Sequence, residues 1–185
     1  MAVATTKQYW NSRLVGASPA SADKNVGDTW TLASGSAGSA SNGAWVITNG
    51  TWNIGADTSS TVFCMLSVNS VPNNDEVLLS LKNGSHKLEV KSTGALTSLK
   101  LVGATTVTIS DLDLSMAEDN AVPLTLRLTL DASGNGNLYI HEIINNADGD
   151  VGYYSVTGAS DSGTGATFGT TSGSVSFHAV YYSKF

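Results

Sequence analysis

Strict alternation of apolar and polar residues is the feature that most constrains the fold of this chain. The clearest case is residues 124–130, Leu-Thr-Leu-Arg-Leu-Thr-Leu, which place four leucines on one face and Thr, Arg and Thr on the other. A period of two is that of a β-strand, so the segment predicts a strand with one buried face. Residues 138–144 begin with the same alternation, and residues 131–137 between them are mostly turn formers. The two segments together predict a β-hairpin.

Similar short segments recur along the whole chain. Turn signals such as Asn49-Gly50, Asn83-Gly84 and Asp148-Gly149 separate them, and helical patterning is confined to residues 114–119. About a dozen short strands at spacings of about 8 to 12 residues indicate an all-β fold of two packed antiparallel sheets, a β-sandwich or jelly roll. The further predicted strands are residues 29–33, 44–48, 51–54, 62–69, 77–81, 87–91, 98–102, 107–110, 153–156 and 175–183.

The length is that of one domain. A chain of 185 residues can bury a stable core without a disulfide or a metal. The Gly/Ser-rich stretches 33–43 and 158–173 are too short to separate two domains, and we predict that they are surface loops. We expect a β-sandwich domain at residues 25–185, preceded by an N-terminal arm and first edge segment at residues 1–24.

The charge of the chain argues against nucleic acid as a partner. Nine Lys and Arg against fifteen Asp and Glu give a net charge of −6, and the basic residues are scattered singly. Nucleic-acid binding needs a clustered positive surface. Charged residues make up only 13% of the chain, against about 25% in ordinary domains. Ser, Thr, Asn and Gly must therefore cover the surface, a composition common in secreted β-proteins and in virion proteins.

Neither a signal peptide nor membrane insertion is expected. The first residues lack a basic segment followed by a continuous apolar stretch. No uncharged apolar run approaches the length of about 20 residues that spans a bilayer. The single cysteine, Cys64, lies in the apolar run 62–66, which predicts a buried, unreactive thiol.

One loop matches a calcium-binding pattern. Asp131, Ser133, Asn135 and Glu142 occupy positions one, three, five and twelve of an EF-hand loop. That template requires helices on both sides, whereas the flanking segments here alternate as strands. The same residue types also form hairpin loops. We therefore expect a turn with no cofactor, and keep calcium binding by these residues as the alternative.

No catalytic constellation is recognisable, and we expect that the protein is not an enzyme. The three histidines lack the spacings typical of zinc sites, and no Gly-x-Ser-x-Gly motif occurs. Asp111 and Asp113 would lie about 7 Å apart on one face of an extended segment, which is within the range of paired glycosidase carboxylates. A glycosidase or lyase using these two residues is the third hypothesis for function, because no second acidic strand or aromatic cleft accompanies them.

Aromatic residues are the best candidates for contact with a partner or a glycan, since rings of Trp and Tyr serve as stacking platforms. Tyr139 and His141 alternate with a leucine and an isoleucine that should face the core. Both side chains should therefore point to solvent or to a neighbouring subunit. Tyr9 and Trp10 precede the first clear strand and are candidates for docking on a partner subunit. Most of the four tryptophans are predicted to lie in the core.

The order of the segments resembles the concanavalin A-like, laminin-G-like jelly roll. The resemblance covers residues 25–185 and rests on patterning. Residues 77–90 resemble its central hairpin, residues 123–140 its strand, glycine turn and strand, residues 167–169 a strand end, and residues 174–182 the closing strand that pairs beside the first. The Glu-x-Asp-x-x-Glu strand of that family's glucanases is absent. For the calcium loops of its lectins, only residues 131–137 and 145–150 offer a loose counterpart.

Together with the low charge and a start at Met1, this resemblance suggests a bacteriophage virion component, such as a capsid decoration or tail accessory protein. The leading hypothesis is a non-enzymatic structural or assembly protein, located in the virion and assembled in the host cytoplasm. It would bind other virion proteins or form a homo-oligomer. The alternative is a carbohydrate-binding, lectin-like module that contacts surface glycans. This alternative predicts two or more exposed aromatic rings beside hydrogen-bonding side chains.

Overall fold

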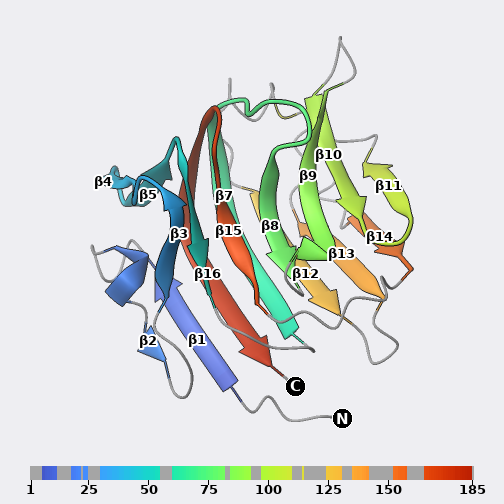
Figure 1. Ribbon diagram of the computed structural model, residues 1–185, viewed down its shortest axis with the longest axis horizontal. Coiled ribbons are helices and arrows are strands. Elements are labelled where there is room, and N and C mark those ends of the chain that lie inside the picture. Colours follow the sequence, from blue (N-terminus) through green and yellow to red (C-terminus); the bar gives the residue numbers. More distant parts are fainter. Residues whose placement is uncertain are drawn as a thin grey trace.

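The computed structural model consists of two antiparallel β-sheets packed face to face (Figure 1). It describes residues 6–11, 18–21, 23–24, 30–54, 60–81, 84–92, 97–109, 114, 124–130, 135–141, 152–157 and 165–184. For residues 6–11, 21, 23–24, 60, 130, 141 and 183–184 it describes the backbone alone. Helical backbone within these residues is limited to the 3-10 turn η1, Pro19–Ser21, and to the single positions Gly84 and Leu114. No helix in the described part of the chain is long and apolar enough to cross a membrane.

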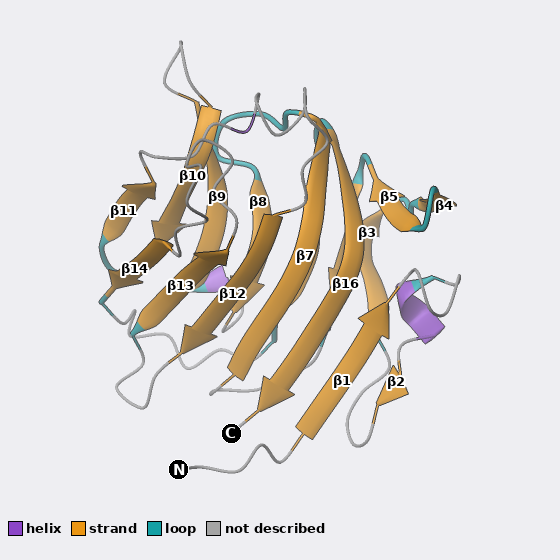
Figure 2. Cartoon of the chain, turned by 180° about the vertical axis from the view of Figure 1, so that it is seen from behind, coloured by secondary structure: helices purple, strands orange, loops and turns teal. Residues whose placement is uncertain are grey.

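The first sheet has nine strands among the described residues, and Figure 2 shows its central strands side by side. Its main path runs in the order β14 (Gly152–Val156), β13 (Gly136–His141), β12 (Leu124–Leu130), β7 (Ser60–Ser70), β16 (Ser174–Lys184), β1 (Thr6–Asn11) and β2 (Asp23–Lys24). Beside this path β5 (Ala44–Ile47) pairs with β16 and with β4 (Ser39–Ser41).

The second sheet has seven strands in the described part of the chain. Its order is β11 (Thr106–Ile109), β10 (Thr97–Val102), β9 (His86–Ser92), β8 (Val77–Leu81), β15 (Thr167–Thr170), β6 (Gly50–Asn53) and β3 (Thr31–Gly35). The all-β two-sheet sandwich expected from the alternation is therefore confirmed. The predicted hairpin is confirmed as well, because β12 pairs with β13 in antiparallel register.

Both Gly/Ser-rich stretches differ from the prediction, and stretch 158–173, which was expected to be a surface loop, contains the paired strand β15. The Gly/Ser-rich stretch 33–43 was expected to be a loop, but it contains β4, which forms a hairpin with β5. The turn is Asn42-Gly43, and both residues have positive φ, 49° and 75°, as a two-residue type I′ hairpin requires. In the segment 1–24, residues 6–11 form β1 and pair with β16 over six positions, Thr6↔Lys184 to Asn11↔Ala179. This backbone pairs within the domain's own sheet.

The core lies between the two sheets and is built from the inward residues of each alternating strand. Phe168 of β15 joins the sheets through edge-to-face contacts with Trp30 at 5.9 Å and with Phe177 of β16 at 5.0 Å between ring centroids. Trp52 is buried as well. Cys64 is fully buried, and this burial raises the pKa of its thiol far above the ordinary value. The predicted burial of the cysteine is thus confirmed.

Candidate functional site on the outer face of the nine-stranded sheet

Alternation leaves large side chains on the outer face of the nine-stranded sheet. In β12 the side chains of Leu124, Leu126 and Leu128 are buried while Arg127 is exposed. In β13 Leu138 and Ile140 are buried while Tyr139 is partly exposed. Phe63 of β7 and Tyr181 of β16 are partly exposed in the same way. Each of these side chains therefore points away from the core, because neighbouring residues in a strand face opposite sides.

Strand pairing brings these side chains into one line across the sheet. The register places Tyr153 of β14 opposite Tyr139, Tyr139 opposite Arg127, Arg127 opposite Phe63, and Phe63 opposite Tyr181. Tyr153, Tyr139, Arg127, Phe63 and Tyr181 are called the aromatic row below. Neighbouring strands lie about 4.8 Å apart, so the row extends about 19 Å across five strands.

Contacts within the aromatic row hold one end of it in place. The rings of Tyr139 and Tyr153 are 4.9 Å apart between centroids and tilted by 50°. The guanidinium carbon of Arg127 lies 4.0 Å from the centroid of the Tyr139 ring, in cation–π range. The Tyr153 hydroxyl donates a hydrogen bond of 2.8 Å to Oδ1 of Asn137. Tyr153 nevertheless remains 56% exposed, so this ring is anchored at its hydroxyl while the ring itself faces solvent.

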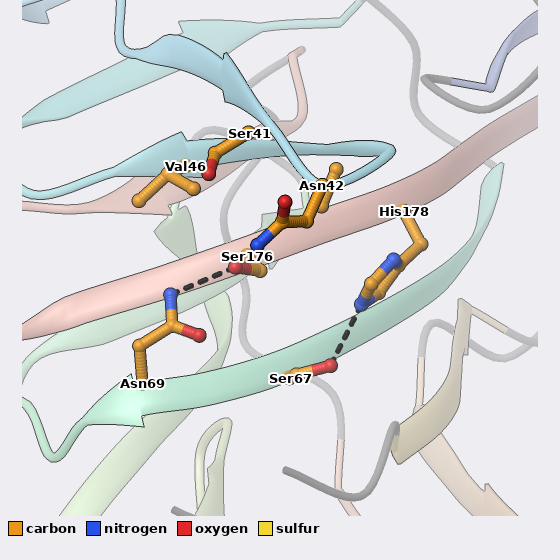
Figure 3. Close-up of a pocket in the computed structure, with 8 residues that line it drawn as sticks. Ser41, Asn42, Val46, Ser67, Asn69, Ser176 and His178 are labelled. Atoms are coloured by element: carbon orange, nitrogen blue, oxygen red, sulfur yellow. Dashed lines mark hydrogen bonds between the residues drawn. The ribbon is translucent and has the colours of Figure 1, made fainter.

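A pocket of about 380 Å3 opens on the same face (Figure 3). It forms where the partner strand of β16 changes. One edge of β16 pairs with β5 up to Phe177 and with β1 from Ala179 onward, and the register against β7 also shifts between these two residues. His178 is the bulged residue at this junction. The lining residues, called the polar pocket, are Ser41, Asn42, Ala44, Val46, Ser67, Asn69, Ser176 and His178.

Neutral hydrogen-bonding groups dominate the polar pocket. Oγ of Ser67 and Nε2 of His178, both buried, lie 2.7 Å apart. The Asn69 amide donates to Oγ of Ser176 at 2.7 Å and to Oγ of Ser174 at 3.3 Å. Figure 3 draws the Ser67–His178 and Asn69–Ser176 hydrogen bonds. The described lining residues include no Asp, Glu, Lys or Arg. The polar pocket therefore suits a neutral ligand rich in hydrogen-bonding groups.

The Ser67–His178 pair also has the spacing of a nucleophile and its general base. Such a pair needs a third group that orients the histidine and donors that stabilise an oxyanion. No carboxylate is present among the described lining residues. Both side chains line the polar pocket.

The aromatic row and the polar pocket share two strands. Phe63, Met65 and Ser67 alternate along β7 with the buried Cys64 and Leu66, so all three face outward. Phe63 in the row is four positions from Ser67 in the pocket, which is about 13 Å along an extended strand. Both features therefore belong to one continuous outer face.

The structure places the sequence-predicted contact residues as follows. Tyr139 faces outward, which confirms its predicted orientation. Only the backbone of Tyr9, Trp10 and His141 is described, so their side chains lie outside the described residues. The backbone of Tyr9 stands opposite Tyr181 in register.

The tryptophans whose side chains are described do not form an exposed platform. Trp30 and Trp52 are buried, and Trp45 packs against the core. The indole nitrogens of Trp45 and Trp52 both donate to the carbonyl of Ala37, at 2.6 and 3.2 Å. The prediction that most tryptophans are core residues is confirmed for these three. The exposed rings are instead tyrosines and a phenylalanine.

Sequence reasoning missed four members of the aromatic row, namely Phe63, Arg127, Tyr153 and Tyr181. The alternation itself already placed Arg127 opposite the leucines of its strand. Nothing local in the sequence indicated that the four residues share one line, because they come from strands far apart in the chain.

For the calcium alternative, Asp131, Ser133 and Glu142 lie outside the described residues, while Asn135 directly precedes β13. Both flanking segments are strands, so the helix–loop–helix of an EF-hand is absent. No cluster of three or more His, Cys, Asp or Glu that could hold a metal occurs among the described residues. Calcium in this loop stays a prediction. Asp111 and Asp113 also lie outside the described residues.

No protein-family model matches this chain, and no curated protein matches it either. Solved structures do. Domain 4 of AbnA, a GH43 extracellular arabinanase from Geobacillus stearothermophilus in complex with arabinotriose, aligns with a TM-score of 0.54 and 9% identity over 98% of this chain and 93% of that chain. The exoplasmic/lumenal domain of VIP36 in its Ca2+/Man3GlcNAc-bound form aligns with a TM-score of 0.52 and 9% identity over 84% and 86% of the two chains.

Two larger structures also match in part. A bifunctional GH43-CE protein of Bacteroides eggerthii aligns with a TM-score of 0.51 and 12% identity, and this chain spans only 22% of its length. An engineered GH43 glycoside hydrolase aligns with a TM-score of 0.50 and 11% identity, and this chain spans 36% of it. At such identities the likeness concerns the fold alone, and it agrees with the two-sheet β-sandwich.

Proposed function

We propose that this protein is a non-catalytic carbohydrate-binding module and that the outer face of the nine-stranded sheet is its binding surface. The observation that carries the proposal is the aromatic row, five side chains aligned in register across five strands. Aromatic rings bind the apolar C–H faces of sugars, while a tyrosine hydroxyl offers a polar edge. Two proteins of the same fold, AbnA domain 4 and the VIP36 domain, have been solved with oligosaccharides bound, which agrees with the proposal.

The aromatic row and the polar pocket would contact different parts of the ligand. The aromatic row runs across the strands for about 19 Å, which suits an extended ligand lying over several rings. The polar pocket, about 380 Å3 in volume, offers the hydroxyls of Ser67 and Ser176 and the amide of Asn69. Sites of this kind orient a ligand through a few placed polar groups.

The first test is binding of the intact protein to an array of neutral and acidic glycans, followed by calorimetry with the best ligand. Tyr153→Ala and Tyr139→Ala should each weaken binding about tenfold, because one stacked ring contributes about 1 to 1.5 kcal/mol. Thr108→Ala, on the exposed face of β11 in the other sheet, is the control and should leave affinity unchanged. The proposal fails if no glycan binds, or if the two tyrosine variants bind as well as the parent.

A structural or assembly protein is the second candidate, and one observation favours it. Tyr153 is a large aromatic side chain with 56% of its surface exposed, and tyrosine is enriched at protein interfaces. In this proposal the same face docks on another protein or on a second copy. The virion setting rests on composition and on the resemblance alone. Light scattering distinguishes the two candidates: a stable oligomer that Tyr153→Ala dissociates, together with no glycan binding, would favour assembly.

A further inference from the structure

Arg127 occupies the middle of the aromatic row. It lies on β12, with Tyr139 opposite on one neighbouring strand and Phe63 opposite on the other. Its guanidinium carbon is 4.0 Å from the centroid of the Tyr139 ring. This contact orders the long side chain before any ligand arrives, which reduces the entropy lost on binding.

The charge of Arg127 is not paired within the described part of the chain. Three ion pairs occur among the described residues, and all of them join Lys87, Glu89 and Lys100 of the seven-stranded sheet to one another or to Asp75 in the turn before β8. A guanidinium that stacks on a ring uses its flat face, while its N–H donors lie in the plane of the group and remain directed away from the ring. Arg127 therefore presents hydrogen-bond donors and a positive charge to solvent between aromatic rings.

We propose that Arg127 recognises a carboxylate on the bound sugar, so that the ligand of this surface is a glycan containing uronic acid. This inference rests on the proposed carbohydrate-binding function and names its ligand class. The planar fork of an arginine matches the two oxygens of a carboxylate and binds them through two parallel hydrogen bonds. A uronic acid carries such a carboxylate on a ring whose apolar face can stack on the neighbouring tyrosine or phenylalanine.

The charge balance of the protein favours a carboxylated ligand over a densely charged polyanion. Sulfated or phosphorylated polymers are held by clusters of cations. The net charge of the chain is −6, and Arg127 is the one cationic side chain described in the aromatic row. A ligand that presents single carboxylates, with neutral hydroxyls for the polar pocket, fits this distribution of charge.

The experiment is calorimetric titration of the intact protein with oligomers of galacturonate, glucuronate and mannuronate, each beside its carboxyl-reduced neutral counterpart. At least one acidic oligomer should bind about tenfold more tightly than its neutral counterpart, because hydrogen bonds to a charged group contribute more to affinity than hydrogen bonds between neutral groups. Arg127→Gln should remove this preference, so that the acidic oligomer and its neutral counterpart bind with equal affinity. Arg127→Lys, which keeps the positive charge but lacks the planar guanidinium, should retain only part of the preference for the acidic oligomer.

Lys91→Gln is the matched control, because it removes one positive charge from β9 of the other sheet. It should leave both affinities unchanged, and a thermal melt of each variant checks that it is folded. Equal affinity for acidic and neutral oligomers, or binding of dextran sulfate without binding of any uronate, would overturn the inference while leaving glycan binding intact. Absence of binding to every acidic and neutral glycan would overturn the proposed function as well.

Discussion

The outer faces of the two sheets are built from the same alternating strands but carry different chemistry. On the seven-stranded sheet the outward side chains bond to one another, as Ser80 does with Thr167 at 2.6 Å and Lys100 with Glu89 at 2.9 Å. On the nine-stranded sheet the outward side chains form the aromatic row, where Tyr153 is 56% exposed. These polar side chains of the seven-stranded sheet are bonded to one another, whereas the aromatic row presents rings and a cation to solvent.

This difference between the two outer faces indicates where a ligand should bind. A ligand on the seven-stranded sheet would have to displace hydrogen bonds and ion pairs that already exist, and would regain only what it broke. A ligand on the aromatic row covers exposed ring surface without breaking a described ion pair. The inward residues of both sheets serve the same core, so the outward residues alone distinguish the two faces.

The largest effect is expected from removing both tyrosines at one end of the aromatic row. The double variant Tyr139→Ala with Tyr153→Ala should lower glycan affinity about 50-fold, since each stacked ring contributes about 1 to 1.5 kcal/mol. Calorimetry with the best array ligand measures the loss. The matched variant, Ser80→Ala with Thr167→Ala on the other face, should bind normally. Similar losses in both double variants would show that the faces do not differ in function.

The next largest effect concerns stability and should appear on the opposite face. Lys100→Met removes the partner of Glu89, which is only 8% exposed. The expected cost is about 1 to 2 kcal/mol of unfolding free energy, limited because Lys87 stays 3.6 Å from Glu89. Urea denaturation measures the cost. The counterpart Arg127→Met, on the nine-stranded sheet, should change stability by about 0.5 kcal/mol or less; a larger loss there would contradict the comparison.

A smaller effect should appear in how the melting temperature of the protein falls at acidic pH. The hydrogen bond from Lys100 lowers the pKa of the Asp75 carboxyl below its ordinary value of 3.8. A carboxyl whose pKa is lowered on folding stabilises the native state fully above its ordinary pKa, and this contribution disappears as the pH falls through the lower, folded value. Thermal melts from neutral pH down to about pH 2 should therefore fall more steeply in the parent than in Asp75→Asn. Arg127→Gln should keep the parent profile.

The smallest effect is expected from the neutral hydroxyl pair on β8 and β15. Replacing both members, Ser80→Ala with Thr167→Val, should change the unfolding free energy by about 0.5 kcal/mol or less, because no partner is left unsatisfied. Ser80→Ala alone should cost more than the double variant. Urea denaturation of the parent, of Ser80→Ala, of Thr167→Val and of the double variant forms a double-mutant cycle. A double variant less stable than the single one would mean that the pair contributes through packing instead.

Much of the fold followed from local patterns. Alternation located β12 and β13 and the hairpin between them, and it predicted that Tyr139 would face outward. A run of apolar residues predicted the burial of Cys64. By contrast, β4 consists of Ser-Ala-Ser and has no hydrophobic pattern to detect, although the adjacent Asn42-Gly43 turn was a usable signal. Likewise β1 exists as a strand through its pairing with β16, and its short sequence alone resembles an arm.

The candidate site depends partly on local sequence patterns and partly on the tertiary structure. The sequence by itself determined which side chains of each strand face inward and which face outward, because the pleat repeats every two residues and one face must be buried. Only the tertiary structure decided that Phe63, Arg127 and Tyr181 lie in one line. The strands β7, β12 and β16 become neighbours through pairings between segments far apart in the chain. Such pairings depend on how two whole sheets share one core, which no local pattern specifies.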